Sequence, residues 1–272
     1  MKAIILAGGF GTRLAEMTEV RPKPMVEIGG RPILWHIMKH FSQFDVQEFV
    51  IALGYRGDDI KRYFLEYPAL TSDLTVHMKT GAVQNHDRRT EPWTVNLVDT
   101  GVATLTGGRV SRLQRWVGNE TFIVTYGDGV ANIDIDALLK HHREQGKIAT
   151  VTAVRPPARF GGLEIDSGAV SRFVEKPQAG EGWINGGFLV FEPEIFDILD
   201  GDQTSLESDA LERLAADGQL AAYQHEGFWQ CMDTLRDRNL LERLWASGEA
   251  PWCTWPTGPT NISQFPRRAR VA

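Results

Sequence analysis

The sequence predicts an α/β protein with a Rossmann-like, mixed but mainly parallel sheet flanked by helices. Short β-rich apolar runs alternate with helical patterns along the first 155 residues, and glycine-containing loops follow the expected strands. A strand, a helix and a second strand in this order imply right-handed crossovers and a sheet covered on both faces. The chain has 272 residues and 42% hydrophobic content, which is enough to bury such a core.

The first 155 residues carry the clearest alternation. Strands are expected at 2–7, 48–53, 121–126 and 148–154, and helices are expected at 31–44, 58–67 and 134–145. Ligands of such sheets bind beyond the carboxyl ends of the strands. Three loops are expected at that edge: the glycine-rich loop after Ala7, GDGV after Tyr126, and RPPARFGG after Val154.

Beyond about residue 155 the expected strands become shorter, and they read GLEID, VSRFVEK, WINGGFLVF and LAAYQH. Helices are expected near 193–199, 205–217 and 234–247. No linker or low-complexity block separates the two parts, so we interpret residues 1–256 as one domain with halves at 1–155 and 156–256. The last segment, 257–272, lacks apolar periodicity and is expected to be a mobile tail.

Charge and composition exclude several classes of function. The formal net charge is -6, whereas nucleic-acid and anionic-membrane surfaces need excess cations spread over one face. We therefore expect no nucleic-acid or membrane partner. The apolar run in MKAIILAGG is too short for a signal peptide or a membrane span, so the protein is expected in the cytoplasm. Cys231 and Cys253 are expected to be free thiols.

The loop that follows the first strand, AGGFGTR, is typical of a phosphate site. Glycines permit a tight turn and close approach of an anion to backbone N–H groups. A Walker loop would need a Gly-Lys-Ser/Thr triplet, and a dinucleotide loop would need a third glycine where Leu14 stands. Further on, Pro22 and Pro24 brace Lys23 and aim one cation. The alternative is a glycine turn with ordinary surface Arg and Lys side chains.

These motifs resemble the sugar-1-phosphate nucleotidyltransferases, whose G-x-G-T-R loop stands here as Gly9–Arg13 and whose lysine segment stands as Pro22–Pro24. Within that family the chain is similar to the glucose-1-phosphate cytidylyltransferases from Met1 to about Trp255. The blocks that carry the similarity are KPMVEIGGRPILWHIMKHFS, EPWTVNLVDTG, TGGR, TYGDGVA, RFGGLEI, EKP, INGGF and GFWQCMDTLRD. One departure is Cys231, which stands where that family is expected to have proline.

The resemblance implies that CTP and α-D-glucose 1-phosphate react to give CDP-glucose and pyrophosphate. The second pKa of a phosphate monoester is about 6, so the sugar phosphate is already an anion near neutral pH and needs no general base. The chemistry instead requires two negative molecules to be held in line and their repulsion to be cancelled. The same loop, lysine and aspartates would also serve dTTP, UTP or GTP, and a non-catalytic nucleotide-sugar sensor is a further alternative.

The resemblance also implies the residues that bind the phosphates. Lys23 would stabilise charge at the α-phosphate, while Thr12 and Arg13 would bind the β and γ groups that leave as pyrophosphate. Arg13 and Asp128 are the other expected catalytic residues. Asp128 and Asp233 would hold Mg²⁺, which usually takes one or two carboxylates plus substrate oxygens. Each aspartate has a structural alternative, because Asp128 could cap a turn and Asp233 could be the N-cap of the 234–247 helix. The nucleotide phosphates would lie on the loop made of Leu6, Ala7, Gly8, Gly9, Phe10, Gly11, Thr12 and Arg13.

Sugar and base contacts complete the implied site. Lys176 would meet the sugar phosphate, while Glu175 and Asn185 would face sugar hydroxyls; a solvated lysine and a turn asparagine are the alternatives. Cytosine needs an acceptor for N4 and a donor for O2 or N3. Thr104 and Arg109 resemble the family's nucleotide-contacting segment, although Arg109 could equally be the exposed start of a helix.

Two aromatic groups complete the expectations. His36 and His40 lie among large apolar residues without a third metal ligand, so core or interface histidines are expected. Trp245, Trp252 and Trp255 could cover the core or make a subunit contact. The family is oligomeric, which favours the contact and implies a homo-oligomer, with a hexamer the assembly that the family suggests. The resemblance also implies a role in surface polysaccharide synthesis.

Overall fold

The computed structural model describes residues 1–11, 21–86, 90–156, 162–166, 169–174 and 182–255. A seven-stranded sheet lies at its centre in the order β14-β10-β13-β8-β1-β4-β7. Neighbouring strands are parallel except at β13, which is antiparallel to β8 and to β10. The mixed, mainly parallel sheet is therefore confirmed. The strands are β1 Lys2–Leu6, β4 Glu48–Leu53, β7 Thr94–Asp99, β8 Phe122–Tyr126, β10 Ala149–Val154, β13 Ile184–Phe191 and β14 Leu220–His225.

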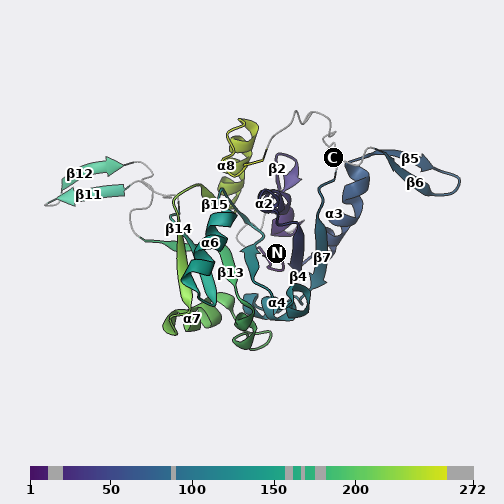
Figure 1. Cartoon of the computed structure of the whole chain (residues 1–272). Helices are drawn as coiled ribbons and strands as arrows, with labels where there is room; N and C mark the ends of the chain where they lie inside the picture. The colour runs from purple at the N-terminus through teal and green to yellow at the C-terminus, as the bar shows by residue number, and fades with distance from the viewer. Residues whose placement is uncertain (12–20, 87–89, 157–161, 167–168, 175–181, 256–272) are drawn as a thin grey trace.

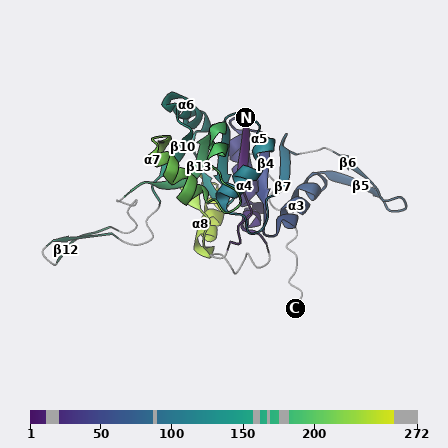
Figure 2. The same cartoon turned by 90° about the horizontal axis from the view of Figure 1, so that it is seen from below.

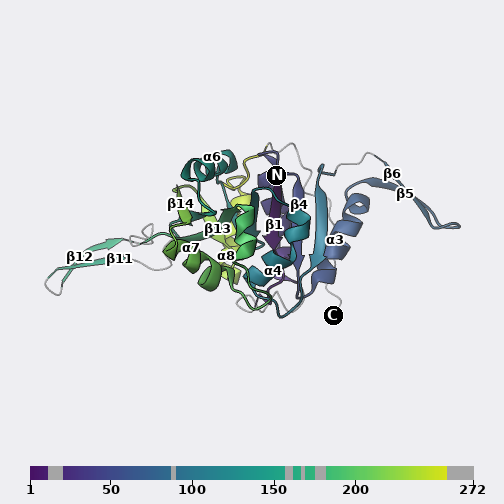
Figure 3. The same ribbon diagram turned by 60° about the horizontal axis from the view of Figure 1, so that its bottom comes forward.

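Helices cover both faces of this sheet, because alternate strand residues point to opposite sides. Ala3 and Ile5 of β1 join one buried cluster, and Ile4 and Leu6 join the other. The first cluster includes α2 Ile33–Ser42, α3 Gly57–Leu70, α6 Ile135–Gln145 and α8 Leu235–Ala246. The second includes α4 Thr106–Arg112, α5 Gln114–Val117, η3 Pro193–Asp197, the π-helical η4 Leu206–Leu211 and α7 Glu212–Ala216. Figure 1 shows α4 and α7 on the opposite side of the sheet from α8, and Figure 3 shows the same layers tilted.

Four small sheets and a short helix complete the described chain. Two of the sheets are hairpins that extend from opposite ends of the molecule in every view (Figures 1 and 2): β5 Asp73–His77 with β6 Ala82–His86, and β11 Gly162–Asp166 with β12 Ala169–Val174. The other two pair β2 Glu27–Ile28 with β3 Arg31–Pro32, and β9 Gly129–Ala131 with β15 Trp229–Cys231. The short helix is η2, Lys23–Met25.

Most elements expected from the sequence are present within a few residues, and the strand at 48–53 has the expected bounds. β7, the β5–β6 hairpin and α4 were not expected. β7 lies at the edge of the sheet and is only partly buried, so its sequence carries a weak apolar signal. β13 lies between β8 and β10. The part of the chain beyond residue 155 therefore contributes strands to the same sheet as residues 1–155.

The aromatic cluster near the end of the described chain belongs to the core. Trp252 and Trp255 are buried among the residues that pack on α2. The expectation that they make a subunit contact is therefore wrong for these two side chains. His36 and His40 are buried as expected, with Nε2 atoms 2.9 Å from the carbonyl oxygens of Ile28 and Ile133. Burial lowers the pKa of each histidine to about 4.

In the part of the chain that the structure describes, no helix has both the length and the apolar character needed to cross a membrane.

Candidate active site

A large cavity opens where β1 and β8 end. These strands are parallel neighbours, and Leu6 pairs with Tyr126 at their carboxyl ends. The loop after β1 therefore runs beside the turn that follows β8, and the N–H of Gly127 donates to the Leu6 carbonyl at 3.0 Å. The cavity measures about 560 Å³. Its lining includes Leu6, Ala7, Gly8, Gly9, Phe10, Gly11, Lys23, Thr104, Arg109, Tyr126, Asp128, Ser205 and Glu207.

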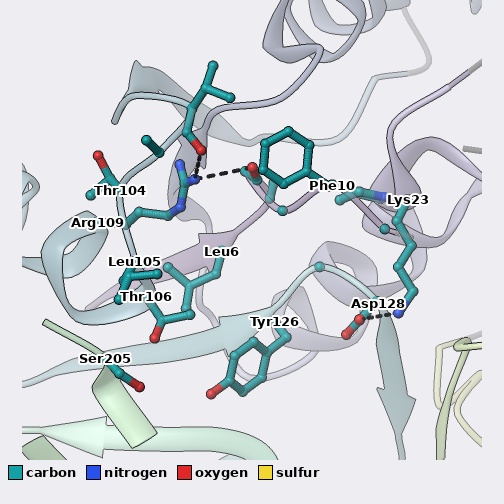
Figure 4. A pocket seen from close by; sticks show the side chains of 18 of the residues that line it. Leu6, Phe10, Lys23, Thr104, Leu105, Thr106, Arg109, Tyr126, Asp128 and Ser205 are labelled. Atoms are coloured by element: carbon teal, nitrogen blue, oxygen red, sulfur yellow. Dashed lines mark hydrogen bonds and ion pairs between the residues drawn. The ribbon is translucent and has the colours of Figure 1, made fainter. Parts of the chain in front are cut away.

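The two ends of this cavity differ in chemistry. Figure 4 shows Thr104 and Arg109 at one end, and Lys23 with Asp128 at the other. Leu6 and Tyr126 lie between them. An elongated molecule with a polar ring at one end and an anionic group at the other fits this order. The Lys23 ammonium stands at the far end from Thr104, whereas the Arg109 guanidinium donates to backbone carbonyls.

Lys23 lies between two carboxylates. Its Nζ donates to Asp128 Oδ2 and to Asp233 Oδ1, each at 2.6 Å. Pro24 is buried beneath the turn after β8, where a Cβ on Gly127 would lie 2.9 Å from the proline Cγ. Burial lowers the pKa of Lys23, but the charges and hydrogen bonds of the two aspartates outweigh it and raise this pKa above the ordinary value. The side chain is therefore charged at neutral pH.

The small β9–β15 sheet brings Asp233 next to Lys23. Cys231 of β15 pairs with Gly129 of β9, and the Met232 N–H donates to the Asp128 carbonyl at 2.8 Å. The helix α8 takes Thr234 as its N-cap, with a reciprocal capping box to Asp237. The alternative that Asp233 caps this helix is therefore wrong, and its carboxylate faces Lys23 instead.

Arg109 hydrogen-bonds to several backbone carbonyls around the end of the cavity where Thr104 lies. Only 5% of its surface is exposed, so the alternative of an exposed helix start is wrong. Its guanidinium donates to the carbonyls of Leu53, Gly101, Gly8 and Val102 at 2.8 to 3.3 Å, and to the Thr100 hydroxyl at 2.7 Å. A Cβ on Gly8 would lie 2.1 Å from the guanidinium. The glycine at that position is therefore required by the close approach of Arg109.

A second cavity, of about 270 Å³, adjoins the first. Tyr126 and Asp128 line both cavities, and Asn185, Trp229, Cys231 and Asp233 line the smaller one. Asn185 Oδ1 accepts from the Gly187 N–H at 2.8 Å, which fixes the turn beside this cavity. Two cavities that meet at a lysine and two carboxylates can hold two anionic molecules side by side.

Comparison with known proteins agrees with this geometry. Residues 2–237 match the family described as Nucleotidyl transferase. The chain belongs to this family. The transferase is 53% identical over 256 residues to the glucose-1-phosphate cytidylyltransferase of Salmonella typhi, covering 94% of this chain and 100% of that protein. It is 44% identical over 256 residues to a probable glucose-1-phosphate cytidylyltransferase of Bacillus subtilis (strain 168), with the same coverage.

The fold of the transferase has counterparts among solved structures. The crystal structure of HddC from Yersinia pseudotuberculosis aligns with a TM-score of 0.66 and 24% identity, covering 90% of this chain and 99% of that one. At this identity the likeness concerns the fold alone.

The structure brings together most of the predicted site residues of the transferase. The described loop residues Leu6 to Gly11, with Lys23, Thr104, Arg109 and Asp128, line the larger cavity, and Asp128, Asn185 and Asp233 line the smaller one. Their roles stay predictions. Thr12, Arg13, Glu175 and Lys176, the RPPARFGG loop and the tail at 257–272 lie wholly or partly outside the described residues.

Sequence reasoning missed several residues that line the cavities, among them Tyr126, Ser205, Glu207 and Trp229. Tyr126 could have been found, because it is the last residue of a buried strand and precedes Gly127 and Asp128. Ser205 and Glu207 carry no local signal, since they reach the cavity from η4, about 80 residues further along the chain.

Cys231 lies directly beside the carboxylates. Its Sγ is 3.5 Å from Asp233 Oδ2. Burial, together with the charges of Asp233 and Asp128, raises the pKa of this cysteine to about 12. The side chain is therefore a neutral thiol at neutral pH, and it adds no negative charge to the site.

Arg109→Lys should destabilise the transferase by about 2 to 4 kcal/mol, because one ammonium cannot replace a fork that donates to five acceptors, three of them on buried residues. Thermal unfolding would measure the change. Arg112→Lys is the matched control, since Arg112 lies on the same helix but pairs with Asp202 in solvent. Equal melting temperatures for the two variants would contradict the structural role of Arg109.

Proposed function

We propose that this transferase moves CMP from CTP to α-D-glucose 1-phosphate and releases pyrophosphate. One observation carries the chemistry: the two adjoining cavities meet at Lys23, Asp128 and Asp233. The 53% identity to a glucose-1-phosphate cytidylyltransferase supports the choice of both substrates.

In this proposal the nucleotide occupies the larger cavity, with its base toward Thr104 and its phosphates toward Lys23. The glucose 1-phosphate occupies the smaller cavity, beside Asn185 and Trp229. An oxygen of the sugar phosphate attacks the α-phosphorus, the bond from that phosphorus to the bridging oxygen breaks, and pyrophosphate leaves. Because the attacking oxygen is already anionic, the chain needs only to hold the two substrates in line and to balance their charge.

Lys23 performs the second of these tasks. Its ammonium stands at the junction of the cavities and has little solvent around it, so its field at a nearby phosphate is weakly screened. In the structure its hydrogen bonds go to Asp128 and Asp233. We propose that it turns to the α-phosphate once the nucleotide is bound.

The two carboxylates fit Mg²⁺ as the metal. Their oxygens converge on one point, since both lie 2.6 Å from the same nitrogen. Among the described residues no group of three or more His, Cys, Asp or Glu side chains gathers to hold a metal. This agrees with an ion that takes one or two carboxylates and completes its shell with phosphate oxygens and water. Bound Mg²⁺ would offset the charge of the triphosphate.

Pyrophosphate release from the purified protein tests the function directly. Glucose 1-phosphate and Mg²⁺ would be offered with CTP, UTP, dTTP, GTP or ATP in parallel. We expect strong preference for CTP. Turnover with another nucleotide would support the proposed reaction but contradict the assignment of cytosine as the base. No turnover with any nucleotide would favour a nucleotide-sugar sensor.

We also propose that the protein is a homo-oligomer, with the hexamer of the family resemblance as the expected assembly. The β5–β6 hairpin supports this, because an isolated two-stranded hairpin is marginal in water. Its apolar side chains are exposed, including Met78 at 88% and Val83 at 56%, and exposed apolar patches mark contact surfaces. The molar mass in solution, measured by light scattering, would decide, and a monomer would contradict the proposal.

We also propose a pathway and a compartment for this reaction. The product would be a nucleotide sugar used to make surface polysaccharide, and it would be made in the cytoplasm, where CTP is available.

A further inference from the structure

We infer that Glu207 is a positioning residue for Tyr126, whose ring separates the nucleotide cavity from the sugar cavity. This inference rests on the proposed function, because it assigns one substrate to each side of the ring. It concerns binding and substrate placement, since Lys23 hydrogen-bonds to Asp128 and Asp233.

Tyr126 occupies the boundary between the two cavities. It is the last residue of β8, two positions before Asp128, and it lines both cavities. Figure 4 shows its ring below Leu6, with the hydroxyl pointing toward the side where Ser205 lies. The backbone turn that follows is held independently, by the hydrogen bonds from Gly127 to Leu6 and from Met232 to Asp128. The phenol is therefore not needed to place the Asp128 backbone.

A close backbone contact holds the ring from the side of the sugar cavity. Gly187 has a φ of +77°, and a Cβ on it would lie 2.6 Å from Cδ2 of Tyr126. The ring therefore packs directly on the Gly187 backbone. The N–H of Gly187 in turn donates to Asn185 Oδ1 at 2.8 Å. A displaced ring would disturb the turn that presents Asn185 to the sugar cavity.

Glu207 fixes the polar end of the ring. The Tyr126 hydroxyl donates to Glu207 Oε1. The second carboxylate oxygen, Oε2, accepts from the Thr106 hydroxyl at 2.6 Å and from the Ser205 hydroxyl at 3.1 Å. Thr106 Oγ1 also accepts from the Leu206 N–H at 2.9 Å. The carboxylate is thus held from α4 and from the start of η4, and it cannot turn without breaking these bonds.

Two restraints act on different parts of the ring. The phenol donates its O–H to Glu207, and an ionised carboxylate can only accept, so this hydrogen bond has one direction. The ring is consequently restrained at one edge by a charged acceptor and on one face by backbone.

The inference predicts a loss in substrate binding rather than in turnover. A hydrogen bond to a charged group is typically worth a factor of about ten or more in an equilibrium. Glu207→Ala should therefore raise KM for glucose 1-phosphate by ~10-fold and also raise KM for CTP, with kcat within about threefold. Glu207→Gln keeps an acceptor for the phenol, so it should restore most of the wild-type KM.

The experiment is steady-state kinetics on the full chain, with CTP and glucose 1-phosphate varied in turn. It compares wild type with Glu207→Ala, Glu207→Gln, Tyr126→Phe and the Tyr126→Phe/Glu207→Ala double variant. Tyr126→Phe keeps the ring and provides a readout if Glu207→Ala does not fold. Because Glu207 acts through the phenol, the double variant should be no worse in KM than the poorer single variant.

Glu192→Ala is the matched control. Glu192 accepts hydrogen bonds from Thr121, just before the opposite end of β8, at 2.9 and 3.0 Å. It lines neither cavity, so its removal should lower the melting temperature and leave both KM values unchanged.

Three outcomes would overturn the inference. Unchanged KM values with a lower kcat would mean that Glu207 only stabilises the fold. Additive losses in the double variant would mean that Glu207 acts independently of Tyr126. A wild-type protein without turnover would overturn the proposed function as well, whereas an active wild type with either of the first two results would overturn the inference alone.

Discussion

Lys23→Ala is expected to lower kcat by on the order of 10²-fold or more while the fold persists. The ammonium stands where the two cavities meet, and only 12% of the side chain is exposed. Its charge would therefore act on a phosphate bound there with little screening by water. Because negative charge is expected to be most concentrated there during transfer, the loss should appear mainly in kcat and less in KM.

Pyrophosphate release at saturating substrates would measure this effect. Lys39→Ala is the control, because the Lys39 ammonium also faces a carboxylate, Glu91 at 3.4 Å, but lies outside both cavities. Near-normal turnover of the Lys23 variant would remove this residue from the mechanism.

Unfolding temperatures provide a second readout on Lys23. Its removal leaves the Asp128 and Asp233 carboxylates facing one point without that cation. The variant should therefore be stabilised by added Mg²⁺ more than the wild type is, because like charges in close proximity favour a bound cation. An identical response of the two proteins to Mg²⁺ would place the metal elsewhere.

Asp128→Asn is expected to abolish Mg²⁺-dependent turnover. Asparagine preserves the size of the side chain but removes the negative charge that would hold the ion, and it weakens the pairing with Lys23. Rates measured across a range of Mg²⁺ concentrations would show the effect.

Asp134→Asn supplies the comparison for this variant. Asp134 lies six residues further along the chain and caps α6 by accepting from the Ala137 N–H at 2.9 Å. Asparagine is also a good N-cap, so this control should keep full activity. If Asp128→Asn instead retained the wild-type rate and the same Mg²⁺ requirement, Asp128 would not be a metal ligand.

The larger cavity shows which local signals were sufficient. The glycine loop after β1 and the GDG turn after β8 were placed correctly at the carboxyl edge of a mainly parallel sheet. Apolar runs and turn residues are properties of short segments, so the ends of these strands can be read from the sequence. The bracing of Lys23 by two prolines was also a local feature, and it pointed to the cation at the junction of the cavities.

Elements with weak or two-sided patterns were harder to predict. The strand β7 was missed because its side chains are half-buried at the edge of the sheet. The three tryptophans near residue 250 could have packed inside or outside, and the sequence could not distinguish these outcomes. The packing of Trp252 and Trp255 against α2 decided the matter.

The sequence by itself determined the fold class, the glycine-rich loop after β1, the position of Asp128 just after β8 and the placement of Lys23 between two prolines. Only the tertiary structure brought Asp233 to Lys23 across 210 residues, turned Arg109 inward onto backbone carbonyls, and placed Glu207 against Tyr126. The physical reason is that these contacts depend on strand register in the β9–β15 pair and on the packing of α4 and η4, which no short segment specifies. Local sequence patterns determine in which strand, helix or loop a residue lies. Packing between segments that are distant in the sequence determines which residues its side chain contacts.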